Sequence, residues 1–142
     1  MLLPISLVSC SDDDEEGVGN KSDLVGTWES VSCTYQWKED GVIVEEGTDS
    51  DNDMRIKFNE DGTYASAEYY NNKWDWEEEG TWNYKNGKIT IRYEDEGESY
   101  SESATVKALT SSKLVIEYID RYTEDGISYE DYALWEYRKI SD

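Results

Sequence analysis

The sequence predicts an all-β fold, a single up-and-down antiparallel barrel of eight or nine strands, on the basis of three observations. Runs of alternating polar and apolar residues follow one another from about residue 24 onward, and short turn signals separate them. No stretch shows convincing helical periodicity. The only proline is Pro4, so no proline interrupts a later strand. Such a meander is expected to close, because closure removes exposed strand edges, and a β-sandwich is the alternative.

The first expected strand runs from Val25 to Trp37 and places Cys33, Tyr35 and Trp37 on one face by its period of two. The remaining strands are expected at 42–44, 54–58, 63–70, 74–84, 88–93, 101–109, 114–122 and 127–140. A polar loop is expected at 47–53. Residue pairs that favour tight hairpins join five further pairs of strands, at Asp40-Gly41, Asp61-Gly62, Asn71-Asn72, Asn86-Gly87 and Asp125-Gly126. Turns at 96–98 and 110–112 join the remaining strands.

The N-terminal residues 1–9 are interpreted as part of a lipoprotein signal peptide. The uncharged apolar run Leu2–Ser9 is shorter than the roughly 20 residues that span a membrane. The stretch LVSC, which ends at Cys10, resembles the lipobox of bacterial lipoproteins, in which the cysteine is acylated. No basic segment precedes the run, so we expect the true start of the signal peptide to lie upstream. An ordinary secretory leader is the alternative.

Residues 10–22 are expected to form an acidic, flexible tether after the lipidated Cys10, and residues 23–142 the folded domain. The like-charged block Asp12–Glu16 cannot bury apolar surface and stays solvated. It resembles the acidic sorting signal of surface-exposed lipoproteins in some Gram-negative bacteria. The predicted location is therefore the cell envelope, at the surface of the outer membrane, with its periplasmic face as the alternative.

Composition narrows the function classes. The formal net charge of −21 disfavours nucleic-acid and anionic-lipid partners, so we expect membrane contact through the lipid anchor only. The chain contains no histidine, which removes the usual general base and the commonest transition-metal ligand. Cys33 is interpreted as a small buried residue. We expect a non-enzymatic protein without a cofactor, and a monomer.

Several short motifs resemble those of a known family. Gly26-Thr27-Trp28, at the start of the first strand, resembles the Gly-x-Trp signature of lipocalins. The stretches FNEDGTY (58–64), GTWNY (80–84) and VKALT (106–110) are similar to the internal hairpins and later strands of bacterial lipocalin-like lipoproteins. The resemblance covers about residues 24–140.

In lipocalins the signature tryptophan closes the base of the barrel and stacks with an arginine from near the last strand. The resemblance implies this structural role for Gly26, Trp28 and Arg138, with a cation–π contact between Trp28 and Arg138. Lys139 lies beside Arg138 in the sequence, which leaves the register open.

The resemblance also implies a cavity for a small apolar or aromatic ligand, and aromatic residues are its candidate walls. Trp74, Trp76 and Trp82 share one parity, so together they line a cavity if that face points inward. A bulge at Gly80 would divide this stripe. Further candidate ligand-binding residues are Tyr35, Trp37, Tyr69 and Trp135. Alternatively the rings fill the barrel, and the protein is a surface interaction module for a protein or glycan partner.

Two arrangements of acidic residues are weaker candidates for a functional site. Asp49, Asp51 and Asp53 alternate in a loop, and Glu60 follows where an EF-hand would place its last ligand. Met54 replaces the glycine that such a loop needs, so a solvated loop without metal is the preferred interpretation. A hydrolase built on paired carboxylates is the third class, and it would require an isolated buried pair in a cleft.

Overall fold

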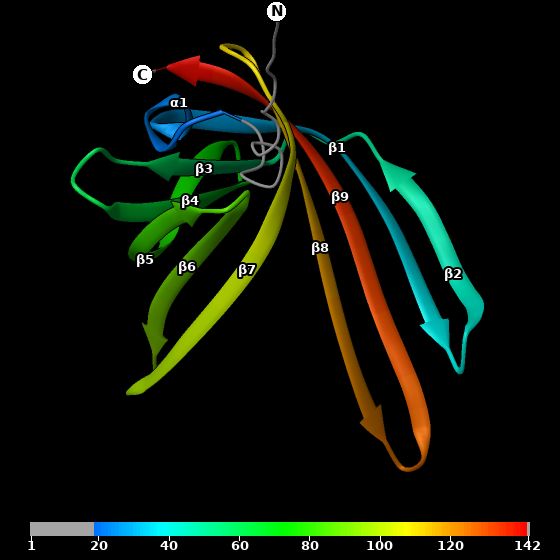
Figure 1. Ribbon diagram of the computed structural model, residues 1–142. Coiled ribbons are helices and arrows are strands. Elements are labelled where there is room, and N and C mark those ends of the chain that lie inside the picture. The colour runs from blue at the N-terminus through cyan, green and yellow to red at the C-terminus, as the bar shows by residue number, and fades with distance from the viewer. Residues whose placement is uncertain (1–18, 142) are drawn as a thin grey trace, which may run out of the picture.

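The computed structural model describes residues 19–141, in which a short helix precedes nine strands (Figure 1). Cys10, the segment 1–9 and most of the expected tether 10–22 lie outside the described residues. The elements are α1 (Lys21–Leu24), β1 (Gly26–Glu39), β2 (Val42–Asp49), β3 (Met54–Phe58), β4 (Thr63–Tyr70), β5 (Lys73–Lys85), β6 (Lys88–Asp95), β7 (Glu98–Leu109), β8 (Lys113–Glu124) and β9 (Ile127–Ser141). Within this range, no helix has the length and apolar character needed to cross a membrane.

The strands form one antiparallel sheet that closes on itself. Neighbours in the chain pair from β3 through to β9, β1 pairs with β3, and β9 returns to pair with β1 from Thr27 to Glu39. Eight strands therefore make the ring, and β2 is an extra strand that pairs with the second half of β1. The predicted barrel of eight or nine strands is confirmed, and the pairing of β1 with β9 excludes the sandwich.

The barrel is narrow at one end and open at the other. β7 pairs with β8 only over residues 105–109 and 114–117, and β1 pairs with β3 only over residues 26–29 and 55–58. Beyond these points the sheet diverges into two ribbons, one of β3 to β7 and one of β8, β9, β1 and β2 (Figure 1). Residues of both ribbons line one cavity.

Tight turns with left-handed backbone conformations set the strand register. Both central residues have positive φ in the hairpins at 40–41, 71–72, 86–87, 96–97 and 125–126. Such turns match the right-handed twist of paired strands, which explains why Asn, Asp and Gly fill most of these positions. The expected strands and hairpins are confirmed. The expected loop at 47–53 was placed too early in the chain, because residues 47–49 belong to β2.

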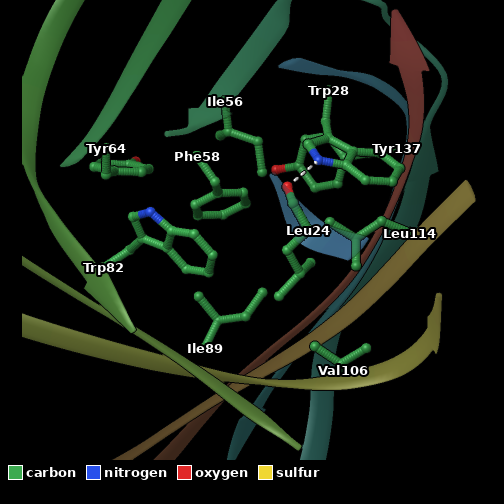
Figure 2. Close-up of a cluster of buried hydrophobic side chains, with 10 residues drawn as sticks. All are labelled: Leu24, Trp28, Ile56, Phe58, Tyr64, Trp82, Ile89, Val106, Leu114 and Tyr137. Carbon is green, nitrogen blue, oxygen red and sulfur yellow. Dashed lines mark hydrogen bonds between the residues drawn. The ribbon is translucent and has the colours of Figure 1, made fainter. Parts of the chain in front are cut away.

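The hydrophobic core lies at the narrow end. Trp28, Leu24 and Leu114 are fully buried there, and Phe58 and Trp82 pack ring to ring at 4.9 Å between centroids (Figure 2). The indole nitrogen of Trp28 donates a hydrogen bond of 2.9 Å to the carbonyl oxygen of Leu24. The sequence analysis missed α1, whose single turn is too short to show periodicity. The helix brings Leu24 into the base of the barrel.

The expected contact between Trp28 and Arg138 is corrected. The ammonium of Lys139 lies over the Trp28 ring, 5.4 Å from its centroid, whereas Arg138 donates a 2.6 Å hydrogen bond to Glu29. The physical reason is the register, which sets Lys139 opposite Trp28 and Arg138 opposite Glu29. Because successive side chains of a strand alternate between faces, Arg138 lies on the outer face, away from the core.

Candidate functional site

The space above the core is a cavity of about 440 Å³ with mostly apolar walls. Its wall residues alternate with outward-facing neighbours along their strands, as expected for a small barrel. The apolar and aromatic lining consists of Met54, Ile56 and Phe58 from β3, Tyr64 from β4, Ile89 and Ile91 from β6, Ala104 from β7, Ile116 and Tyr118 from β8, and Trp135 and Tyr137 from β9. A cavity of this size and lining suits a small organic molecule.

Tyr137 places a polar group at the base of this cavity. Its side chain is only 5% exposed, and its ring stacks on Trp135 with 5.8 Å between centroids. Within residues 19–141 its hydroxyl has no hydrogen-bond partner. Burial raises the pKa of Tyr137, so the hydroxyl keeps its proton at neutral pH. A buried donor without a partner is uncommon in folded proteins, and a bound ligand would satisfy it.

Two glutamates lie on the side of the cavity nearer the open end. Glu78 accepts a hydrogen bond of 3.2 Å from the Tyr64 hydroxyl, and Glu102 accepts one of 2.7 Å from the Tyr93 hydroxyl. Burial and then the charge of Glu102 raise the pKa of Glu78. The bond to Glu102 is the main cause that raises the pKa of Tyr93 to about 12. Both tyrosines therefore stay protonated donors at neutral pH.

Of the six predicted ligand-binding residues, one lines this cavity, a second lines a hollow beside it, and Trp37 lines neither. Trp135 lines the cavity itself, and Tyr35 lines an adjoining hollow of about 330 Å³ that shares Met54 and Trp135 with it. Trp37 is 37% exposed farther along β1, where its ring lies 6.2 Å from Tyr129. That these residues bind a ligand stays a prediction.

Tyr69, Trp74 and Trp76 do not line the cavity, which corrects their expected placement. A bulge in β5 sets Glu78 opposite Ser66 but Trp76 opposite Ala67, so the parity of β5 reverses between Glu78 and Trp76. The two tryptophans thereby move to the outer face of the sheet. The sequence left open that a bulge at Gly80 divides the stripe, and a bulge does divide it, a few residues before Gly80.

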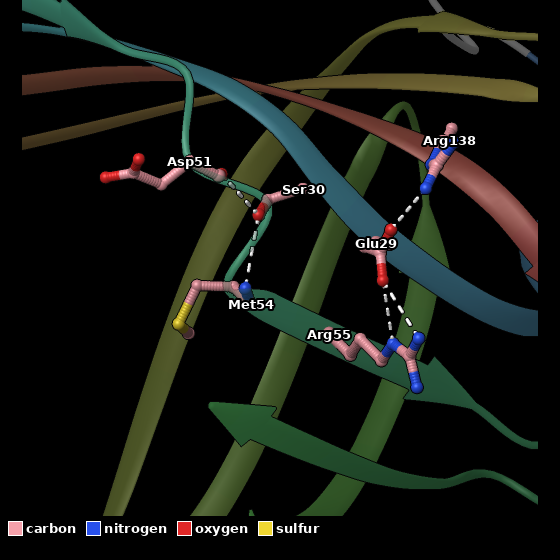
Figure 3. A network of polar contacts seen from close by, with 6 residues as sticks. All are labelled: Glu29, Ser30, Asp51, Met54, Arg55 and Arg138. Atoms are coloured by element: carbon pink, nitrogen blue, oxygen red, sulfur yellow. Dashed lines mark hydrogen bonds and ion pairs between the residues drawn. The ribbon is translucent and has the colours of Figure 1, made fainter. Parts of the chain in front are cut away.

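On the outer face, Trp74 joins a polar network around Glu29. The guanidinium of Arg55 lies 4.0 Å from the centroid of the Trp74 ring and donates a 3.0 Å hydrogen bond to Glu29. Glu29 also binds Arg138 (Figure 3). Burial opposes ionisation of Glu29, but the two arginines outweigh it and lower its pKa. This network joins β1, β3 and β9 on the outside of the barrel, and we assign it a structural role.

The acidic stretch at 49–53 shows no metal-binding geometry. Ser30 fixes its course, because the serine hydroxyl donates to the carbonyl oxygen of Asp51 and accepts from the backbone N–H of Met54, both at 3.2 Å (Figure 3). In the part of the chain that the structure describes, no three His, Cys, Asp or Glu side chains lie together as a metal site would require. Cys33 is a free, half-buried thiol on the inner face.

Comparison with known proteins agrees with this geometry. A sequence profile described as a lipocalin-like domain matches residues 24–116. The chain belongs to the lipocalin-like domain family. Its family members share a fold that suggests the binding of small molecules, and the cavity lies where the two ribbons of this lipocalin-like barrel diverge. A search of curated proteins found no match.

Solved structures resemble the lipocalin-like barrel at low sequence identity. A lipocalin-like protein from Bacteroides uniformis is 16% identical with a TM-score of 0.52, covering 83% of this chain and 99% of its own. Insecticyanin from the tobacco hornworm Manduca sexta is 12% identical with a TM-score of 0.61, and the match covers 92% of this chain and 69% of that one. An uncharacterized protein from Bacteroides eggerthii is 15% identical with a TM-score of 0.51, covering 82% and 99%. These likenesses concern the fold alone.

The sequence analysis missed several residues of the lipocalin-like cavity: Tyr64, Glu78, Glu102 and Tyr137. Tyr137 shares the parity of Trp135, so alternation along the last strand could have found it. The two glutamates gave no usable signal, because carboxylates occur throughout this acidic chain. The pairing of β5 and β7 with β6 places Glu78 and Glu102 on one wall of the cavity.

Proposed function

We propose that this lipocalin-like protein binds a small apolar or aromatic molecule in its barrel cavity and catalyses no reaction. The observation that carries the proposal is the cavity of about 440 Å³, whose mostly apolar walls include Tyr137, a buried residue whose hydroxyl has no hydrogen-bond partner within residues 19–141. Burial of an apolar ligand supplies the affinity, at roughly 25 cal/mol for each Å² removed from water. A hydrogen bond from Tyr137 orients the ligand, and stacking on Trp135 adds contact.

A fluorescence titration with phenylnaphthylamine, a neutral apolar probe, tests this proposal. Ala104 lines the cavity, so Ala104→Phe fills part of it and should weaken probe binding at least about tenfold. Ala65 pairs with Lys57 and Glu79 on the outer face, so Ala65→Phe is the matched control and should leave the affinity unchanged. Equal affinity in both variants, with cooperative thermal unfolding, would place the probe outside the cavity and contradict the proposal.

A second candidate function rests on the outer aromatic residues. Tyr69 and Trp74 lie 5.3 Å apart, and Trp76 is 42% exposed beside them in the β4–β5 hairpin. Exposed rings of this kind suit stacking on a glycan, which would make the protein a surface interaction module. In a glycan-array experiment, Trp76→Ala should abolish binding while Ala104→Phe leaves it intact. The opposite pattern would assign any glycan to the cavity.

We also propose that Cys10 carries the lipid that holds the protein at the outer membrane, as a monomer with its domain facing the cell exterior. The support is the lipobox-like sequence before Cys10 and the acidic block after it. Cys10→Ala should move the protein from the membrane fraction to the soluble fraction. Protease treatment of intact cells should remove the surface-exposed domain, whereas protection from protease would indicate the periplasmic face.

A further inference from the structure

One side of the cavity wall is acidic, and no Lys or Arg lies among the described residues that line the cavity. Among the described residues that line the cavity, Glu78 and Glu102 are the charged ones, and none is Lys or Arg. Arg55 of β3 lies on the outer face and pairs with Glu29. Within residues 19–141, the two carboxylates therefore line the cavity without a Lys or Arg in the same lining.

The two carboxylates lie on the same wall of the cavity, on β5 and β7, which both pair with β6. Burial raises the pKa of Glu78, and the negative charge of Glu102 raises it further. Glu102 also acts electrostatically on Tyr118, although β7 and β8 no longer pair at that level. A positive charge placed between these groups would relieve the repulsion.

The hollow that adjoins the cavity is also acidic. It is lined by Asp49, Asp51, Asp53 and Glu68, together with the aromatic rings of Tyr35 and Trp135, and it contains no basic residue in the described chain. These carboxylates are too dispersed to coordinate a metal ion, as no group of three acidic side chains meets that requirement in residues 19–141. Their arrangement fits a diffuse organic cation better than a metal ion.

We propose that the ligand of this cavity is an organic cation, an amine whose ammonium group binds between Glu78 and Glu102 while its apolar or aromatic body packs against Trp135 and reaches toward Tyr137. This inference rests on the proposed function and adds the charge of the ligand to it. Charge-assisted hydrogen bonds to the two carboxylates hold the ammonium group. The faces of nearby aromatic rings such as Tyr118 also attract a cation.

Isothermal titration calorimetry with three probes of similar shape tests the ligand charge. The probes are naphthylmethylamine, which is cationic at neutral pH, naphthylmethanol, which is neutral, and naphthoate, which is anionic. We expect the cation to bind at least about tenfold more tightly than the alcohol, because its ammonium group makes charge-assisted hydrogen bonds that a hydroxyl group cannot make. The anion should bind more weakly than the alcohol.

Matched variants locate the cation. Glu78→Gln and Glu102→Gln keep the side-chain shape, so they should remove most of the preference for the cation and leave binding of the alcohol intact. Glu60→Gln removes the same charge from an exposed turn at the narrow end and should change nothing. These titrations are repeated at high salt, because screening removes long-range attraction by the net charge of −21 more than it removes direct contacts.

Each outcome has a distinct meaning. Failure of all three probes to bind would overturn the proposed function and this inference together. Equal binding of the cation and the alcohol would overturn the inference and leave the proposed function standing. A preference for the cation that disappears at high salt, or that falls equally in Glu60→Gln, would show nonspecific attraction and would also overturn the inference.

Discussion

Glu29 illustrates how a single residue joins three strands of this barrel. Its side chain is 7% exposed and accepts hydrogen bonds from Arg55 at 3.0 Å and Arg138 at 2.6 Å. We expect Glu29→Gln to lower the free energy of unfolding by about 1–3 kcal/mol at neutral pH, because it removes two charge-assisted bonds. Chemical denaturation measures this change. Glu136→Gln, which breaks an exposed pair with Lys113 at 3.9 Å, is the control and should change stability little.

The pH dependence of this effect follows from the pKa of Glu29, which is lowered in the folded protein from 4.5. A lowered carboxyl pKa contributes stability that is complete above the unfolded pKa and is lost as the pH falls through the folded pKa. The difference between wild type and Glu29→Gln should therefore be constant at neutral pH and shrink below about pH 4.5. A difference that persists unchanged in acid would contradict the ion-pair explanation.

For Glu78, the effect of ionisation on the stability of the fold has the opposite sign from that for Glu29. Its raised pKa means that its ionisation weakens the folded state at neutral pH, and this penalty disappears as the pH falls below the unfolded value near 4.5. We expect Glu78→Gln to raise the free energy of unfolding slightly at neutral pH, by less than about 1 kcal/mol because the group is partly solvated. The gain should vanish in acid. A destabilised variant at neutral pH would show that the carboxylate has a structural role.

At the scale of one element, β5 determines which aromatic rings reach the cavity. Gly80 lies between its two halves, and a Cβ atom added there would collide with the carbonyl oxygen of Arg92 in β6. We expect Gly80→Ala to lower the free energy of unfolding by about 2 kcal/mol or more, because β5 and β6 cannot separate to make room for the methyl group without losing their pairing. Gly62→Ala is the comparison. A Cβ atom added at Gly62 meets no atom within 4 Å, but the residue has φ +92°. The substitution should therefore lower the free energy of unfolding by only about 1 kcal/mol. Thermal unfolding distinguishes the two, and equal losses would contradict the steric explanation.

The same strand shows what sequence patterns can and cannot predict. The hairpin at Asn86-Gly87 was predictable because few residue pairs tolerate two left-handed conformations in succession. The bulge between Trp76 and Glu78 was not, because its residues differ little from ordinary strand residues and its position depends on the partner strand. Trp135, named as a candidate wall residue, does line the cavity, whereas alternation placed Trp74 and Trp76 on the wrong face.

For the whole molecule, the closed sheet was predictable and the shape of its open end was not. Strand count, short turns and the Gly26-Thr27-Trp28 motif were enough to predict the barrel. The divergence of the two ribbons depends on where pairing stops between β7 and β8, which no residue type marks. Residues from both sides of that divergence line the cavity. The candidate site thus follows from the arrangement of the whole sheet and not from any local motif.

The central claim is that the cavity between Tyr137 and Glu78 is a ligand site. A crystal structure of the protein bound to naphthylmethylamine tests this claim most directly. We expect the naphthyl ring against Trp135 and the ammonium nitrogen within hydrogen-bond distance of Glu78 or Glu102. An empty cavity in crystals grown under saturating amine, or amine bound only at the outer rings of Trp74 and Trp76, would contradict the claim.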